Sequence, residues 1–122
     1  MNFVEWWEKN QEEIKVIKTF STTACPDDIH ILDIAIDKMR VYIARTGELL
    51  SEAEYFYKYE LGNAVKRQEG ITNAKLIAEG EVAHIKKVYS GLERLNAALT
   101  HGLEALRTRI SLAKQLYKNV GE

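Results

Sequence analysis

Glu81 and His84 have the Glu-x-x-His spacing that supplies metal ligands in ferritin-like di-iron bundles. Such a site needs a second Glu-x-x-His motif and two further carboxylates, all directed into the bundle. The sequence contains no second copy of the motif. Helical periodicity also places Glu81 and His84 beside the apolar stripe of their helix, not on it. We therefore expect no metal site here.

Nucleophilic catalysis is not indicated either. The chain has a single cysteine, Cys25, and three scattered histidines. A covalent mechanism needs a nucleophile and a base within hydrogen-bonding reach of each other, and these residues form no such pair in the sequence. The sequence also has no glycine-rich phosphate-binding loop. We predict a protein that is not an enzyme and that needs no cofactor.

Basic residues repeat along the C-terminal third of the chain. Lys87, Arg94 and His101 recur every seven residues and so share one outer face of a helix, with Lys86, Arg107 and Lys114 one position to the side. This face has two explanations. It is a solvated surface that pairs with an acidic N-terminal segment, or it is a track for a phosphate backbone, whose binding would weaken steeply with salt.

Four aromatic residues and a lysine fill the segment from Tyr55 to Tyr59. Tyr57 belongs to the apolar stripe of its helix, whereas Tyr55 and Tyr59 point to other faces. Exposed aromatics are typical of subunit or partner interfaces. They could instead stack unpaired bases, because basic side chains lie nearby at Lys58, Lys66 and Arg67.

Long helices must position these side chains. From Ala78 to Val120, apolar residues recur at alternating steps of four and three, which is the pattern of a helix packed on other helices. We predict one uninterrupted helix over residues 73–118, about 65–70 Å long at roughly 1.5 Å per residue. Asn96 is the polar exception on the stripe. It either fixes the register of the packed helices or faces water at a rim.

Two more helices precede it. A short helix over residues 1–20 has Asn2 as its N-cap, and a long helix over residues 26–67 begins at Pro26. The stripe of the second helix passes through Gly47 without slipping, although a break there is the alternative. Gly70 ends this helix and Thr72 or Asn73 caps the next. The predicted fold is all-α: a short N-terminal helix and a long antiparallel two-helix coiled-coil hairpin, in a single domain over residues 1–122.

The bulk composition of the 122-residue chain agrees with this picture. No apolar run approaches the roughly 18 residues that cross a bilayer, so no membrane association is expected. The lone Cys25 favours a reducing, cytoplasmic location. Residues 1–37 carry three lysines against eight carboxylates, whereas residues 86–122 carry seven basic residues against three acidic ones. The two ends are therefore opposite in charge.

The C-terminal half, AKLIAEGEVAHIKKVYSGLERLNAALTHGLEALRTRISLAK, resembles the helical region of the recombination mediators of T-even-like bacteriophages. It is also similar to small helical accessory proteins of phage recombination. The resemblance covers roughly residues 41–118 and implies an oligomeric protein of the host cytoplasm that binds single-stranded DNA and helps to load a recombinase. The mediators carry a basic cluster at the end of the first long helix, where this chain has Lys58-Tyr59-Glu60.

These observations lead to two functional predictions. One is an oligomeric accessory protein with single-stranded DNA and a recombination protein as partners. Its DNA-contacting residues would be Tyr55, Lys58, Tyr59, Lys66, Arg67, Lys86, Lys87, Arg94, Arg107 and Arg109. The other is a protein-only scaffold, adaptor or inhibitor that binds a partner protein through its helical faces. In both, oligomerisation completes the bundle, because one short helix cannot cover two long apolar stripes. The predicted interface is Tyr57, Leu92, Asn96, Leu99, Leu103 and Leu106.

Overall fold

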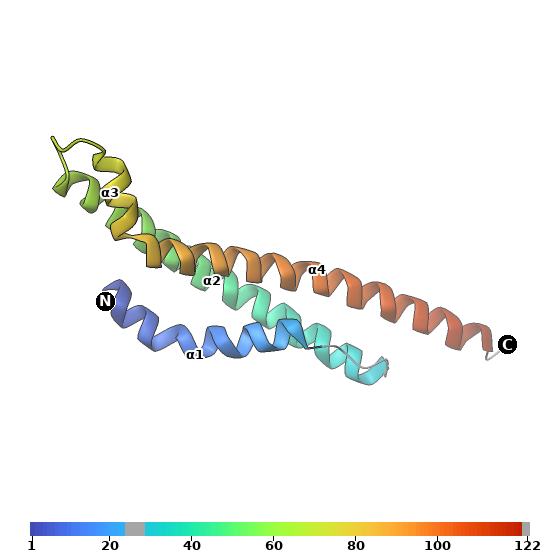
Figure 1. Cartoon of the computed structure of the whole chain (residues 1–122). Helices are drawn as coiled ribbons and strands as arrows, with labels where there is room; N and C mark the ends of the chain where they lie inside the picture. Colours follow the sequence, from blue (N-terminus) through green and yellow to red (C-terminus); the bar gives the residue numbers. More distant parts are fainter. Residues whose placement is uncertain (24–28, 121–122) are drawn as a thin grey trace.

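A computed structural model of the chain describes residues 1–23 and 29–120, and these residues form helices without any strand (Figure 1). The helices are α1 (Phe3–Thr22), α2 (Ile29–Arg67), α3 (Ala74–Glu81) and α4 (Ala83–Val120). The all-α prediction is confirmed. The predicted helix start at Pro26 lies outside the described residues, as does Cys25. Over the described ranges, no helix combines the length and the apolar character that a membrane span needs.

α2 and α4 lie side by side and run in opposite directions (Figure 1). Two contacts show the antiparallel direction, because the residue number decreases along α2 as it increases along α4. In the first, Tyr57 stacks on Tyr89 with ring centroids 5.8 Å apart. Further along, the side chain of Asn96 donates to the backbone oxygen of Ile43 over 3.0 Å. α2 continues through Gly47, so the alternative of a break there is wrong.

Asn96 is part of a polar contact inside the apolar interface between α2 and α4. Its Nδ2 also donates to the hydroxyl of Thr46 over 2.9 Å, and Thr46 is fully buried. The Thr46 hydroxyl in turn donates to the backbone oxygen of Tyr42. Because a shift of one helix would leave these buried groups unpaired, the contact favours a single register. This is the first of the two roles predicted for Asn96.

The predicted uninterrupted helix over residues 73–118 is wrong at one point. Helix α3 ends at Glu81 and α4 begins at Ala83, because Val82 leaves helical geometry with φ −104° and ψ 14°. Gly80 lies two residues earlier and is costlier than alanine inside a helix by about 1 kcal/mol. The kink directs α3 away from the line of α4 while Val82 stays buried in the core (Figure 1).

The turn between α2 and α3 follows the predicted chemistry in part. Gly70 adopts φ +83°, the left-handed conformation predicted to end α2. Asn73 occupies the N-cap position of α3 but is itself left-handed, with φ 62°, and its side chain makes no capping hydrogen bond. At the other end of the chain, Asn2 caps α1 as predicted, since its Oδ1 accepts from the Glu5 backbone N–H over 2.9 Å.

α1 lies against both long helices and supplies the third layer of the core. It runs antiparallel to α2 and parallel to α4, burying Phe3, Trp6, Ile14 and Ile17. Where α1 covers α4, the buried stripe of α4 widens beyond the four-three pattern and includes Val88 and Leu95. A three-helix core therefore forms within one copy of the chain.

This arrangement changes the context of the predicted subunit interface. Leu92, Leu99, Leu103 and Leu106 are buried within a single copy. Tyr57 and Asn96 are half-buried and contact Tyr89 and Thr46 of the same copy. The reason is that α1 and α2 together cover the stripe of α4, whereas the sequence predicts that part of it stays open. Homo-oligomerisation itself stays a prediction, and it needs other surfaces.

Such surfaces exist at the C-terminal end of α4. The helix extends past the start of α2 (Figure 1), and the apolar pattern continues without a covering helix. Leu112, Leu116 and Tyr117 are exposed there, Tyr117 to 83%. Tyr117 continues the four-three stripe that is buried up to Ile110, and Leu112 and Leu116 lie beside this stripe.

Candidate nucleic-acid interface

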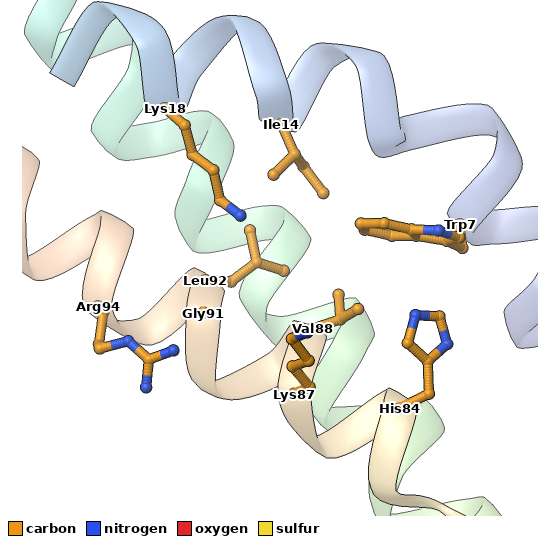
Figure 2. A pocket seen from close by; sticks show the side chains of 9 residues that line it. All are labelled: Trp7, Ile14, Lys18, His84, Lys87, Val88, Gly91, Leu92 and Arg94. Atoms are coloured by element: carbon orange, nitrogen blue, oxygen red, sulfur yellow. The ribbon is translucent and has the colours of Figure 1, made fainter. Parts of the chain in front are cut away.

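A groove of about 260 Å³ lies between α1, from Trp7 to Lys18, and the first half of α4 (Figure 2). We call it the α1/α4 groove. The two helices contact each other less extensively than α2 contacts α4, and the space left between them is open to side chains from both. Its lining residues are Trp7, Ile14, Lys18, His84, Lys87, Val88, Gly91, Leu92 and Arg94.

The floor of the groove is apolar and belongs to the core. Ile14 and Leu92 are almost completely buried, and Val88 lies between them and His84 (Figure 2). Gly91 lacks a side chain, and a Cβ added there would meet nothing within 4 Å. Because Gly91 has no side chain, α4 does not fill the groove at this position.

The walls of the groove carry three cations. Lys18 extends from α1 toward α4, and Lys87 and Arg94 extend from α4 (Figure 2). No ion pair between described residues involves any of these three side chains. Uncompensated charges of one sign along a groove focus the electrostatic potential and attract an anionic ligand.

Two aromatic side chains close the other end of the groove. The edge of the His84 ring packs against the face of the Trp7 ring, with centroids 5.8 Å apart and planes at 89° (Figure 2). Phe3 contacts His84 in a similar way at 5.5 Å. His84 is thus held between two aromatic rings, while Glu81 accepts hydrogen bonds from Arg67 and Gln68. The Glu-x-x-His pair is split between different partners, and no group of metal-binding side chains gathers elsewhere in the described residues.

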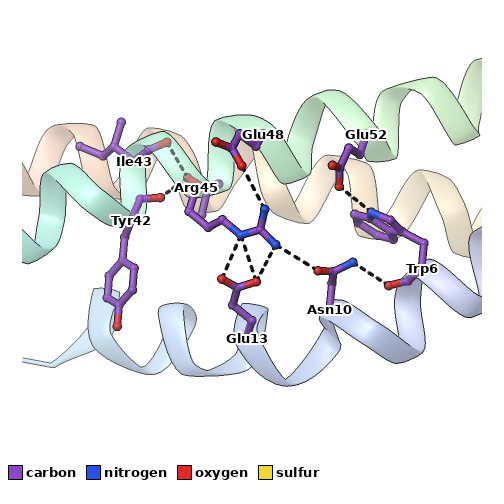
Figure 3. Close-up of polar contacts among 9 residues, drawn as sticks. Trp6, Asn10, Glu13, Tyr42, Ile43, Arg45, Glu48 and Glu52 are labelled. Atoms are coloured by element: carbon purple, nitrogen blue, oxygen red, sulfur yellow. Dashed lines mark hydrogen bonds and ion pairs between the residues drawn. The ribbon is translucent and has the colours of Figure 1, made fainter.

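The opposite side of α1, which faces α2, is closed by a polar network (Figure 3). The Arg45 guanidinium donates to both Glu13 oxygens at 2.9 Å and to Glu48 at 3.0 Å. It also reaches the Asn10 oxygen at 3.2 Å, and the Asn10 amide donates to the Trp6 backbone oxygen. This network joins α1 to α2 at a point where the apolar stripe of α1 is interrupted.

Charge pairing shifts the titration of this network. The hydrogen bonds from Arg45 hold the pKa of the Glu13 carboxyl below its ordinary value. The bonds to Glu13 and Glu48 raise the pKa of Arg45 in turn. An acidic side chain of α1 is therefore paired with an arginine of α2. No ion pair between described residues links α1 to the basic face of α4, which disfavours the prediction that the two pair.

The predicted site residues of α2 lie apart from the groove. Lys58 pairs with Glu54 at 2.6 Å and Arg67 pairs with Glu81 at 2.9 Å, whereas Lys66 is exposed. Tyr55 and Tyr59 are exposed as predicted and stack on each other, with ring centroids 5.9 Å apart and planes at 12°. The structure therefore separates these residues into a second surface, which we call the tyrosine face (Tyr55 and Tyr59).

The predicted basic residues of α4 fall into two groups. Lys86 and Arg107 are exposed along the helix, outside the groove, while Lys87 and Arg94 line it. Arg109 is half-buried and lines a separate apolar hollow with Leu112 and Leu116. Only two of the ten predicted DNA-contacting residues are thus brought together in one concave site.

Sequence reasoning missed the contribution of α1 to this site. Trp7, Ile14 and Lys18 are spaced by seven and four residues and share one helical face, which was a usable signal. Adjacent tryptophans were another, because Trp6 and Trp7 cannot both point into one core. What the sequence lacked was the partner of this face, since nothing in the pattern of α1 alone indicates that it lies along α4.

Comparison of the chain with protein-family models, with curated proteins and with solved structures finds no match. The resemblance to phage recombination mediators therefore stays a prediction.

Proposed function

We propose that this protein is a non-enzymatic helical accessory protein that binds single-stranded DNA along the basic side of α4. The observation that supports this most strongly is the α1/α4 groove, in which Lys18, Lys87 and Arg94 lie without acidic partners among the described residues. Lys86 and Arg107 extend the positive potential along the exposed length of α4. A helix of this kind can follow a phosphate backbone through several cations.

An oligomeric state fits the same proposal. The apolar end of α4, formed by Leu112, Leu116 and Tyr117, is exposed and lies next to the basic residues Lys114 and Lys118. Exposed apolar patches rimmed by polar residues mark interaction sites. We propose that copies of the chain associate through this end, which would join their basic faces into a longer surface. The likeness to recombination mediators suggests a recombinase as the further partner.

A protein-only scaffold or adaptor is the second candidate function. The tyrosine face supports it, because Tyr55 and Tyr59 are exposed to 61% and 55% and stacked aromatics are common in protein interfaces. In that case α2 would carry the binding surface, and the basic side of α4 would be a solvated face.

Fluorescence anisotropy with a labelled single-stranded oligonucleotide separates the two candidates. We expect binding at about 50 mM salt that weakens strongly at about 200 mM, because each neutralised phosphate releases counterions. The double variant Lys87→Gln/Arg94→Gln should lose most of this binding. The matched control, Lys66→Gln/Lys75→Gln, removes the same charge from the turn region, where both side chains are exposed and outside the groove.

Absence of binding at about 50 mM salt would eliminate the nucleic-acid function. Equal losses of oligonucleotide binding in the two double variants would show that binding depends only on net charge. The groove would then have no specific part in binding.

A further inference from the structure

The α1/α4 groove combines two kinds of side chain that serve different parts of one ligand. Trp7 offers an aromatic surface at one end, and Lys18, Lys87 and Arg94 offer positive charge along the walls (Figure 2). The floor between them, formed by Ile14, Val88 and Leu92, is apolar. A ligand that fills this space is flat and apolar in one part and anionic in another.

We propose that the groove holds one unstacked nucleotide of a single-stranded DNA, with its base on Trp7 and its flanking phosphates on Lys18, Lys87 and Arg94. This inference rests on the proposed DNA-binding function and assigns it a site that includes α1. It replaces Tyr55 and Tyr59 by Trp7 as the residue that stacks a base.

The two adjacent tryptophans have different environments. Trp6 is 4% exposed, and its indole N–H donates to Glu52 over 2.7 Å, so the whole side chain is committed to the interface between α1 and α2. Trp7 is half-buried and lines the groove, and the edge of the His84 ring packs against one face of its indole (Figure 2). Stacking on an aromatic side chain contributes substantially to single-strand binding for any base. Trp7 is the tryptophan that is placed for it.

The positions of the cations favour a chain of phosphates over a single compact anion. Lys87 and Arg94 are seven residues apart on α4, which corresponds to about 10 Å along the helix axis at roughly 1.5 Å per residue. Lys18 lies across the groove on α1. One free phosphate cannot contact all three, whereas successive phosphates of one strand can. An acidic peptide would satisfy the cations but would leave the ring of Trp7 without a flat partner.

The size of the groove limits what enters it. Its volume of about 260 Å³ lies just below the range of about 300–1,000 Å³ that is usual for small-molecule pockets. The groove therefore has room for one base with its sugar, and the rest of the strand must lie outside it on the basic face of α4. This predicts weak preference for base sequence, because an aromatic surface accepts every base.

Tryptophan fluorescence and anisotropy together test the proposal on the full-length chain. Titration with oligothymidylate should quench the wild-type emission, and Trp7→Leu should abolish most of the quenching and weaken binding by about tenfold. The matched control is Tyr59→Leu, which removes an exposed aromatic of the tyrosine face and should leave both readouts unchanged. Circular dichroism of each variant establishes that the helices are retained.

The cation on α1 provides an independent test. Lys18→Gln should weaken oligonucleotide binding and make the slope of log K against log salt shallower by about 0.7, the value for one phosphate contact on a single strand. Lys9→Gln is the matched control, because Lys9 lies on the same helix, is exposed and does not line the groove. Variants at Lys9 and Lys18 change net charge equally, so a difference between them reports on position.

The possible outcomes separate this inference from the proposed function. Salt-dependent binding that is unchanged in Trp7→Leu and in Lys18→Gln overturns the inference and leaves DNA binding by α4 intact. Absence of any oligonucleotide binding overturns both. Quenching by a polyglutamate peptide that equals the quenching by oligothymidylate would assign the groove to an acidic peptide and would also overturn the inference.

Discussion

The two sides of α1 are built differently, although both face a long helix of the same chain. Toward α2, the Arg45 guanidinium contacts Glu13, Glu48 and Asn10, and the charges are paired (Figure 3). Toward α4, Lys18 and the facing Lys87 have the same sign and no acidic partner among the described residues (Figure 2).

Because its two sides differ, one helix can be fixed in the fold on one side and present unpaired charge on the other. A network of paired charges holds α1 against α2 and fixes its position, since both partners and a buried amide would have to be separated to release it. The other side of α1 is then free to carry unpaired charge, whose mutual repulsion is tolerated because the helix is held elsewhere. An anionic ligand would neutralise the cations on the α4 side, as Glu13 pairs with Arg45 on the α2 side.

The largest effect is expected from a change that weakens both sides at once. Ile17 is fully buried on α1, and Ile17→Ala should lower the free energy of unfolding by about 2–4 kcal/mol through lost burial and the cavity that remains. Urea denaturation followed by circular dichroism measures this. A loss below about 0.5 kcal/mol would show that α1 is not packed as described, and Val16→Ala, at an exposed neighbour, is the control.

Removing only the polar contacts between α1 and α2 should lower the free energy of unfolding by less than Ile17→Ala does. Arg45→Met removes the bidentate contact with Glu13 and the hydrogen bond to the buried Asn10. Because Arg45 and Glu13 are partly exposed to solvent, we expect a loss of about 1–2 kcal/mol. Arg40→Met, which breaks an exposed pair with Asp37, should change stability by less than about 0.5 kcal/mol. Equal effects would contradict the distinction.

The same side of α1 should respond to acid. Since the pKa of Glu13 is lowered in the folded protein, its ionised form stabilises the fold at pH values above the ordinary glutamate pKa of about 4.3. That contribution is lost as the pH falls through this value and below it. Glu13→Gln should therefore be less stable than the wild type at pH 7, with a smaller difference at pH 3. A difference that is constant with pH would contradict the assignment.

The smallest effect is expected on the α4 side. Lys87→Gln removes an exposed cation that forms no ion pair with a described residue, so the free energy of unfolding should change by less than about 0.5 kcal/mol. The sign should be stabilising, because repulsion from Lys18 and Arg94 decreases. Differential scanning calorimetry at low salt would detect it. A clear loss of stability would mean that Lys87 has a structural role and is not held ready for a ligand.

Much of the fold follows from residue spacing alone. The apolar stripes of α2 and α4 predict two long helices, and Gly70 predicts the turn that reverses the chain. Asn2 and the N-terminus of α1 follow from capping chemistry. These predictions succeed because they depend on local periodicity and on the conformations that single residues prefer.

The remaining features depend on contacts between distant residues. The break at Val82 needs the packing of α3 on α2 as well as the nearby glycine. The pairing of Asn96 with Thr46 needs the register of two helices, which neither residue specifies alone. Trp7 and Lys18 join Lys87 and Arg94 only because α1 lies parallel to α4. Sequence spacing identifies the face of each helix but not the partner of that face.

The salt dependence of the proposed DNA binding tests the central idea, which is that the unpaired cations beside α1 bind an anionic strand. The slope of log K against log salt is measured for the wild type, for Lys87→Gln/Arg94→Gln and for the control Lys66→Gln/Lys75→Gln. We predict that the slope for the groove variant is shallower by roughly 1.4, at about 0.7 per phosphate contact on a single strand, while the control keeps the wild-type slope. Identical slopes for all three proteins would contradict the account.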